Sequence, residues 1–174
     1  MKMMNIFFLM FLTLTVFSQT TDEKLMLIEV NKVRSNPASY IKVVEDFKKM
    51  KTDTTIGGFT VTRKSNTDWV KECDETINFL KTSKSVDTLT FDKEAYNKLT
   101  NFNFVGEHTH LVTNGSENVV ISNSVTEGLV LLLIDANVPD KAHRINLMNP
   151  KAKKVAVKKF VYKNKTYFVQ DFTN

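Results

Sequence analysis

Apolar residues recur along most of the chain at spacings of three and four, which is the period of one helix face. This spacing predicts amphipathic helices over residues 21–34, 37–50, 68–82 and 93–104. After Ser124, a capping residue, apolar side chains run almost all round the predicted helix, which is typical of a buried helix. Cys73 falls on the apolar stripe of the third helix, so we expect a buried structural thiol and not a nucleophile.

Near the C-terminus the period shortens to two, which indicates strands. Residues 155–162 and 166–172 predict two antiparallel strands around the turn 163–165. In the second strand Tyr167 and Val169 face one way, and Phe168 and Phe172 the other. A strand that is apolar on both faces belongs inside a sheet covered on both sides. Residues 51–66 are mostly polar and contain two glycines, so we expect a loop there.

The chain opens with Lys2 and about a dozen mostly apolar residues, fewer than the roughly 20 needed to span a bilayer. Val16 and Ser18 suit the −3 and −1 positions of a cleavage site before Gln19. We therefore predict a signal peptide over residues 1–18, a single domain over 19–174, and a secreted, extracellular protein. An uncleaved membrane anchor is the alternative interpretation of the same segment.

Composition adds three expectations. With one cysteine the chain forms no intrachain disulfide, and sequons at Asn114 and Asn164 are compatible with an exported glycoprotein that carries both segments on its surface. The net charge is +5, and lysines crowd residues 151–165. That basic stretch predicts contact with an anionic surface such as lipid head groups, or else a solvated strand surface. No motif for nucleic-acid recognition is present, so we expect no nucleic-acid partner.

All three histidines lie between residues 108 and 143, and three acids share that window: Glu117, Glu127 and Asp135. Imidazoles and carboxylates that meet in a cleft can bind a divalent metal or hold one another by hydrogen bonds. The spacing alone does not decide between these, since the chain has no HExxH motif.

Four segments together resemble one family. Residues 142–150, Ala-His-Arg-Ile-Asn-Leu-Met-Asn-Pro, resemble the His-Arg-x-Asn-Leu/Ile-x-Asn-Pro box of the CAP superfamily of cysteine-rich secretory proteins, antigen 5 and plant pathogenesis-related proteins. Residues 116–119, Ser-Glu-Asn-Val, are similar to its Gly-Glu-Asn-Ile box. Residues 133–139 and 31–37 resemble segments of single-domain members without disulfides. The resemblance implies an α+β fold, a three-layer α-β-α sandwich with helices on both faces of a mostly antiparallel sheet.

The family implies a cleft that holds two histidines and two acids. Glu117 and His143 are carried over directly from the two boxes. The second histidine is His108 or His110, and we favour His108 because residues 106–109 better resemble the Gly-His-Thr segment of the family. The second acid is Glu127 or Asp135, and we favour Glu127 because an inward-facing carboxylate on a buried helix needs a partner. The implied metal ligands are His108, His143, Glu117 and Glu127, with a divalent ion such as zinc.

The resemblance implies a secreted, non-enzymatic protein that binds a lipid, a sterol or another small hydrophobic ligand, or that acts in signalling. The alternative is a metal-dependent hydrolase in which His108 and His143 hold zinc while Glu117 or Glu127 activates a water molecule. A third interpretation is a surface-active protein that works through the lysines of residues 151–165.

Overall fold

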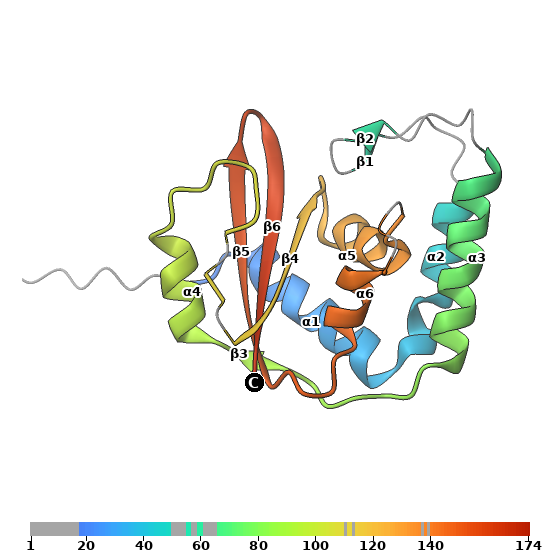
Figure 1. Cartoon of the computed structure of the whole chain (residues 1–174), viewed down its shortest axis with the longest axis horizontal. Coiled ribbons are helices and arrows are strands. Elements are labelled where there is room, and N and C mark those ends of the chain that lie inside the picture. Colours follow the sequence, from blue (N-terminus) through green and yellow to red (C-terminus); the bar gives the residue numbers. More distant parts are fainter. Residues whose placement is uncertain are drawn as a thin grey trace, which may run out of the picture.

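A mixed four-stranded sheet lies between helices in the computed structural model of this chain (Figure 1). The structure describes residues 18–49, 55–56, 59–60, 66–109, 111–112, 114–136, 138 and 140–174. Residues 1–17 of the predicted signal peptide therefore lie outside the described residues. Within the described part, no helix is long and apolar enough to cross a membrane. The predicted α+β class is confirmed.

The sheet has the strand order β3–β5–β6–β4. Its strands are β3 (Thr90–Phe91), β4 (Gly115–Ile121), β5 (Lys154–Tyr162) and β6 (Lys165–Thr173). β6 pairs antiparallel with both β5 and β4, whereas the short β3 pairs parallel with β5. The turn predicted over residues 163–165 is confirmed at Lys163 and Asn164, which both have positive φ, as a tight two-residue hairpin requires, whereas Lys165 already begins β6.

Six α-helices and one 3₁₀ turn complete the described part. They are α1 (Thr21–Ser35), η1 (Pro37–Tyr40), α2 (Ile41–Lys49), α3 (Asn66–Thr82), α4 (Lys93–Thr100), α5 (Val125–Ile134) and α6 (Ala142–Leu147). The Ser124 side chain caps α5 as predicted. The helix predicted over 93–104 ends earlier, because Asn101 closes α4 and Phe104 stacks on Phe160 of the sheet at 4.4 Å between ring centroids.

The loop predicted over residues 51–66 is wrong in part. Two short strands, β1 (Thr55–Ile56) and β2 (Phe59–Thr60), pair antiparallel there, and α3 already begins at Asn66. β-branched and aromatic residues at these four positions suit a strand, although polar neighbours obscure the pattern. Residues 50–54, 57–58 and 61–65 of this region lie outside the described residues.

Each face of the sheet has its own hydrophobic core. On one face Phe168 and Phe172 of β6 pack in a cluster with residues of α1, α3 and α5. On the other face Tyr167 and Val169 pack in a cluster with Tyr96 of α4. Figure 1 shows α4 on one side of the sheet and α1, α5 and α6 on the other. The predicted alternation of β6 is therefore confirmed.

Two predictions about single positions are also confirmed. Cys73 is fully buried in α3, and burial raises the pKa of its thiol to about 12, which makes the thiol inert at neutral pH. The sequon residues Asn114 and Asn164 are both exposed on the surface.

Candidate functional site

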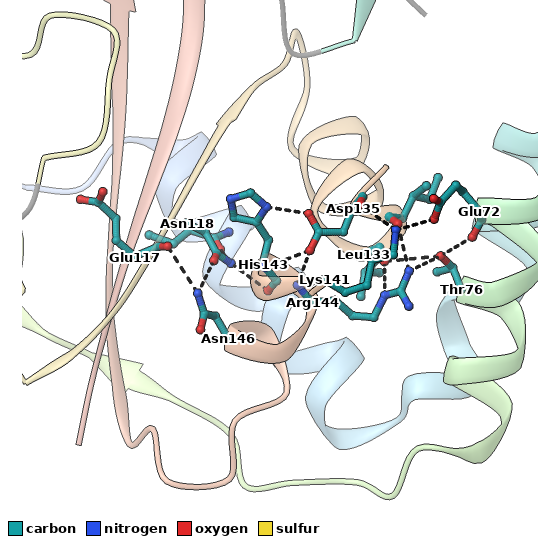
Figure 2. A network of polar contacts seen from close by, with 12 residues as sticks. Glu72, Thr76, Glu117, Asn118, Leu133, Asp135, Lys141, His143, Arg144 and Asn146 are labelled. Atoms are coloured by element: carbon teal, nitrogen blue, oxygen red, sulfur yellow. Dashed lines mark hydrogen bonds and ion pairs between the residues drawn. The ribbon is translucent and has the colours of Figure 1, made fainter. Parts of the chain in front are cut away.

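Asp135, which is buried, and His143, which is partly exposed, form a carboxylate–imidazole pair at the start of α6 (Figure 2). The two atoms of the pair, His143 Nδ1 and Asp135 Oδ1, lie 2.6 Å apart. The other carboxylate oxygen accepts the backbone N–H groups of His143 at 2.9 Å and Arg144 at 3.3 Å. Asp135 follows the last residue of α5 in a left-handed conformation, with φ 53°. This turn directs its carboxylate from the end of one helix to the beginning of the next.

A second pair, Glu117 with His108, lies at the edge of the sheet. Glu117 projects from β4, and its Oε1 lies 2.7 Å from His108 Nδ1. Its two oxygens also accept the backbone N–H of Thr109, at 3.0 and 3.1 Å, and Oε2 accepts the Thr109 hydroxyl. The Glu117 side chain is about 10% exposed, whereas that of His108 is about half exposed. The carboxylate therefore positions a surface imidazole.

The two pairs come together through their imidazole rings. The rings of His108 and His143 are parallel to within 2°, with 6.5 Å between their centroids. Two amide side chains join β4, which carries Glu117, to α6, which carries His143. Asn118 on β4 donates to the carbonyl of His143 at 3.2 Å, and Asn146 on α6 donates to the Asn118 side chain at 2.9 Å (Figure 2). The predicted meeting of His108, Glu117 and His143 is thus found in the structure.

Glu127 lies elsewhere. Its carboxylate accepts the Ser122 hydroxyl at 2.9 Å and the backbone N–H of Asn123 at 2.8 Å, while its own N–H bonds to Ser124. It therefore caps the first turn of α5, and Asp135 at the opposite end of that helix takes the place beside His143. Eight residues of helix separate the two acids by about 12 Å. The preference for Glu127 over Asp135 does not match this arrangement. His110, the alternative to His108, lies outside the described residues.

Sequence reasoning missed a third acid next to the site. Asp171 on β6 stands opposite Glu117 on β4 and is only 1% exposed, yet neither of its oxygens has a hydrogen-bond partner among the described residues. Burial, followed by the neighbouring Glu117 carboxylate, raises the pKa of Asp171 to about 8. The Asp171 carboxyl can therefore carry the proton that a hydrogen bond to Glu117, the residue opposite it, would need. The available signal was Gln170-Asp171, a polar pair inside an otherwise apolar strand.

Two buried arginines, also not predicted as structural elements, connect the segments around the site. Arg34 is fully buried and donates to four backbone carbonyl groups, those of Asp87, Leu147, Asn149 and Ala152. Arg144, next to His143, donates to the carbonyls of Leu133 and Ile134 and to the hydroxyl of Thr76 (Figure 2). A guanidinium has five donors, so one side chain can join several loops. These contacts hold α6 in place.

The donor set suits a transition metal through its imidazoles. A metal-binding histidine commonly directs its other ring nitrogen to a carboxylate, which sets the tautomer and the ring orientation. Both His108 and His143 have this arrangement. In the described part of the chain, however, no three His, Cys, Asp or Glu side chains are grouped closely enough to hold a metal ion by themselves.

The lysines of residues 151–165 are partly neutralised by acids. Three of the seven have acidic partners: Lys153 with Asp87 at 3.0 Å, Lys158 with Glu23 at 3.4 Å and Lys159 with Asp22 at 2.6 Å. Lys151, Lys154, Lys163 and Lys165 are exposed. The basic stretch therefore presents fewer uncompensated charges than its sequence indicates.

Comparison of the chain with protein-family models, with curated proteins and with solved structures finds no match in any of the three.

Proposed function

We propose that this chain is a binding protein whose site is the pair of facing imidazoles, His108 and His143, and that the bound species is a divalent transition metal such as zinc. One observation supports this most strongly: a carboxylate orients each ring through Nδ1, and the two rings are parallel. The ring nitrogens opposite the carboxylates would hold the ion. A bound ion would supply a positive charge at this surface and attract an electron-rich ligand.

In this proposal Glu117 and Asp135 orient the rings and do not act as ligands. Their oxygens are already occupied by backbone N–H groups and imidazoles. Water molecules or a ligand complete the coordination, since structural zinc sites have four protein donors and this one offers two. Such an incomplete set is typical of an open site. The hydrolase alternative has less support, because Glu127 is a helix cap and Glu117 is hydrogen-bonded to Thr109.

The four segments that resemble the CAP superfamily support the wider role. They suggest a secreted protein that binds a hydrophobic ligand such as a lipid or a sterol, or that acts in signalling. They favour such a binding protein over an enzyme. In the same proposal the exposed lysines of residues 151–165 would make a secondary contact with anionic lipid.

Zinc titration by calorimetry at pH 7.5 tests the site. We expect micromolar or tighter binding to the purified chain and at least a tenfold loss in both His108→Ala and His143→Ala. Asp135→Asn removes the orienting carboxylate and should weaken binding by about 10- to 100-fold. Protons compete with the ion for the imidazole nitrogens, so affinity should fall as the pH is lowered.

His110→Ala is the matched control, since it removes an imidazole two residues along the chain from His108 and should leave zinc affinity unchanged. Thermal melts of every variant separate ligand loss from unfolding. Equal zinc affinity in the wild type and in His143→Ala would show that the facing imidazoles are not the site. A loss confined to His110→Ala would move the site to that histidine.

A further inference from the structure

The turn between β5 and β6 carries an apolar side chain that the fold leaves uncovered. Val161, near the end of β5, is 71% exposed, more than any other large hydrophobic residue that the structure describes. Figure 1 shows this turn projecting past α4 and α5. A single exposed valine is ordinary on a protein surface, so its neighbours decide whether it marks a contact.

A second exposed valine lies beside this turn. Val105 is 51% exposed, and the loop that carries it is held against the hairpin on both sides of it. Phe104 stacks on Phe160 of β5, with 4.4 Å between ring centroids. Gly106 lies so close to Tyr162 that a Cβ added there would be 2.8 Å from the ring. The two exposed valines therefore lie at the same end of the sheet, although they come from different segments of the chain.

The charge at this end of the sheet is positive. Lys163 and Lys165 are exposed, and neither forms an ion pair with an acid in the described part of the chain. Lys163 lies over the ring of Tyr162, with its ammonium nitrogen 5.1 Å from the centroid. Apolar side chains flanked by lysines suit the surface of an anionic bilayer, because the apolar groups enter the interface while the ammonium groups stay at the phosphates.

The lysines at the other end of β5 belong to a different surface. β5 rises by about 26 Å from Lys154 to Tyr162, and the two lysines between them are paired with acids of α1. Uncompensated charge is therefore divided between the two ends of the strand. Exposed valines accompany it only at the turn.

We propose that the hairpin tip, made of Val161, Lys163, Lys165 and the adjoining Val105, inserts into the surface of an anionic lipid bilayer. This inference rests on the lipid contact proposed above and assigns it to one end of the hairpin. Charge complementarity favours anionic lipid over a second copy of the chain, which would bring the same lysines against these. The tip contains neither His108 nor His143.

Cosedimentation with vesicles tests the attraction by charge. We expect the purified secreted chain, produced without a glycan on Asn164, to bind a two-to-one mixture of phosphatidylcholine and phosphatidylserine at least tenfold more tightly than phosphatidylcholine alone. High salt should abolish that preference. Lys163→Glu should weaken binding to the mixed vesicles about tenfold or more. Lys84→Glu is the matched control, because it makes the same change in net charge at an exposed lysine outside the stretch 151–165, and it should leave binding nearly unchanged.

Insertion of the valine is measured separately. Val161→Ser removes apolar surface without changing the charge and should weaken binding to the mixed vesicles about tenfold. Val161→Cys labelled with the environment-sensitive dye NBD should show a blue shift on these vesicles, whereas Lys84→Cys labelled in the same way should not. The thiol of Cys73 is buried and takes no label in the folded chain. Thermal melts confirm that each variant is folded.

The remaining outcomes separate the tip from the wider lipid contact. Equal losses in Lys163→Glu and Lys151→Glu, with no blue shift at position 161, would overturn the tip and leave the general contact of the lysines standing. Absence of binding to both kinds of vesicle would overturn the tip and the lipid contact together. Self-association that Val161→Ser abolishes, without vesicle binding, would assign the tip to a second copy instead. Zinc calorimetry tests the imidazole site independently of all these results.

Discussion

Two buried aspartates lie near the candidate site, Asp135 beside His143 and Asp171 opposite Glu117, and their surroundings differ in one respect. Asp135 is 3% exposed and Asp171 is 1% exposed, so water reaches neither. Asp135 accepts two backbone N–H groups and the imidazole of His143. Asp171 accepts nothing in the described part of the chain and faces another carboxylate.

The difference shows that hydrogen-bond donors, and not depth, decide what a buried acid does. Three donors hold the Asp135 carboxylate in place and make it a positioning residue for His143. Asp171 has burial and Glu117 acting in the same direction, so its pKa rises to about 8. One acid therefore stabilises the fold near the imidazoles, and the other is held against Glu117 at a cost in stability that grows as the pH rises.

The largest expected effect is that of Asp135→Ala. It leaves the N–H groups of His143 and Arg144 and the imidazole without their acceptor, next to a partly exposed side chain. Leaving buried hydrogen-bond donors without an acceptor costs about 1–3 kcal/mol, so we expect a loss of that size in the free energy of unfolding. Urea denaturation measures it. A loss below about 1 kcal/mol would contradict the role given to these donors.

Asp171→Asn should have a smaller effect of opposite sign. The ordinary pKa of an aspartate is 3.8, and in the folded chain that of Asp171 is about 8. Between these values the folded state binds more protons than the unfolded state, so wild-type stability falls as pH rises through this window. Asparagine does not titrate, so the variant lacks this pH-dependent loss of stability, and its side-chain amide can donate to Glu117. We expect the variant to gain stability over the wild type, with a larger gain at pH 8 than at pH 5.

Urea denaturation of both proteins at the two pH values checks this. A gain that does not depend on pH would show that Asp171 is ionised in the folded state across the whole window.

The smallest effect concerns Glu127→Gln. Glutamine also serves at this position of a helix cap, and its carbonyl oxygen can accept the same two groups, so the loss should be about 0.5 kcal/mol. Zinc affinity should not change, in contrast to Asp135→Asn. Calorimetry and urea denaturation measure the two quantities. Loss of zinc binding in Glu127→Gln would restore this acid to the metal site.

Local pattern was enough to predict the elements that lie near the site. Ser124 signals the start of α5, and the alternation of Tyr167, Phe168 and Val169 signals a strand covered on both faces. Capping and alternation depend on neighbours within a few residues, so the sequence alone carries this information. The resemblance to the CAP superfamily then predicted that His108, Glu117 and His143 come together. Their spacing in the sequence alone does not predict this.

Tertiary structure decided which acid meets which partner. Glu127 and Asp135 stand eight positions apart on one helix, and only the placement of α6 at the C-terminal end of that helix selects Asp135. The same holds for Arg34, whose carbonyl acceptors lie 53 to 118 residues away. Asp171 stands opposite Glu117, a second carboxyl group, because β6 pairs with β4 in this register. A side chain's ionisation and partners depend on groups from distant segments, so they follow from packing and not from the residues beside it in sequence.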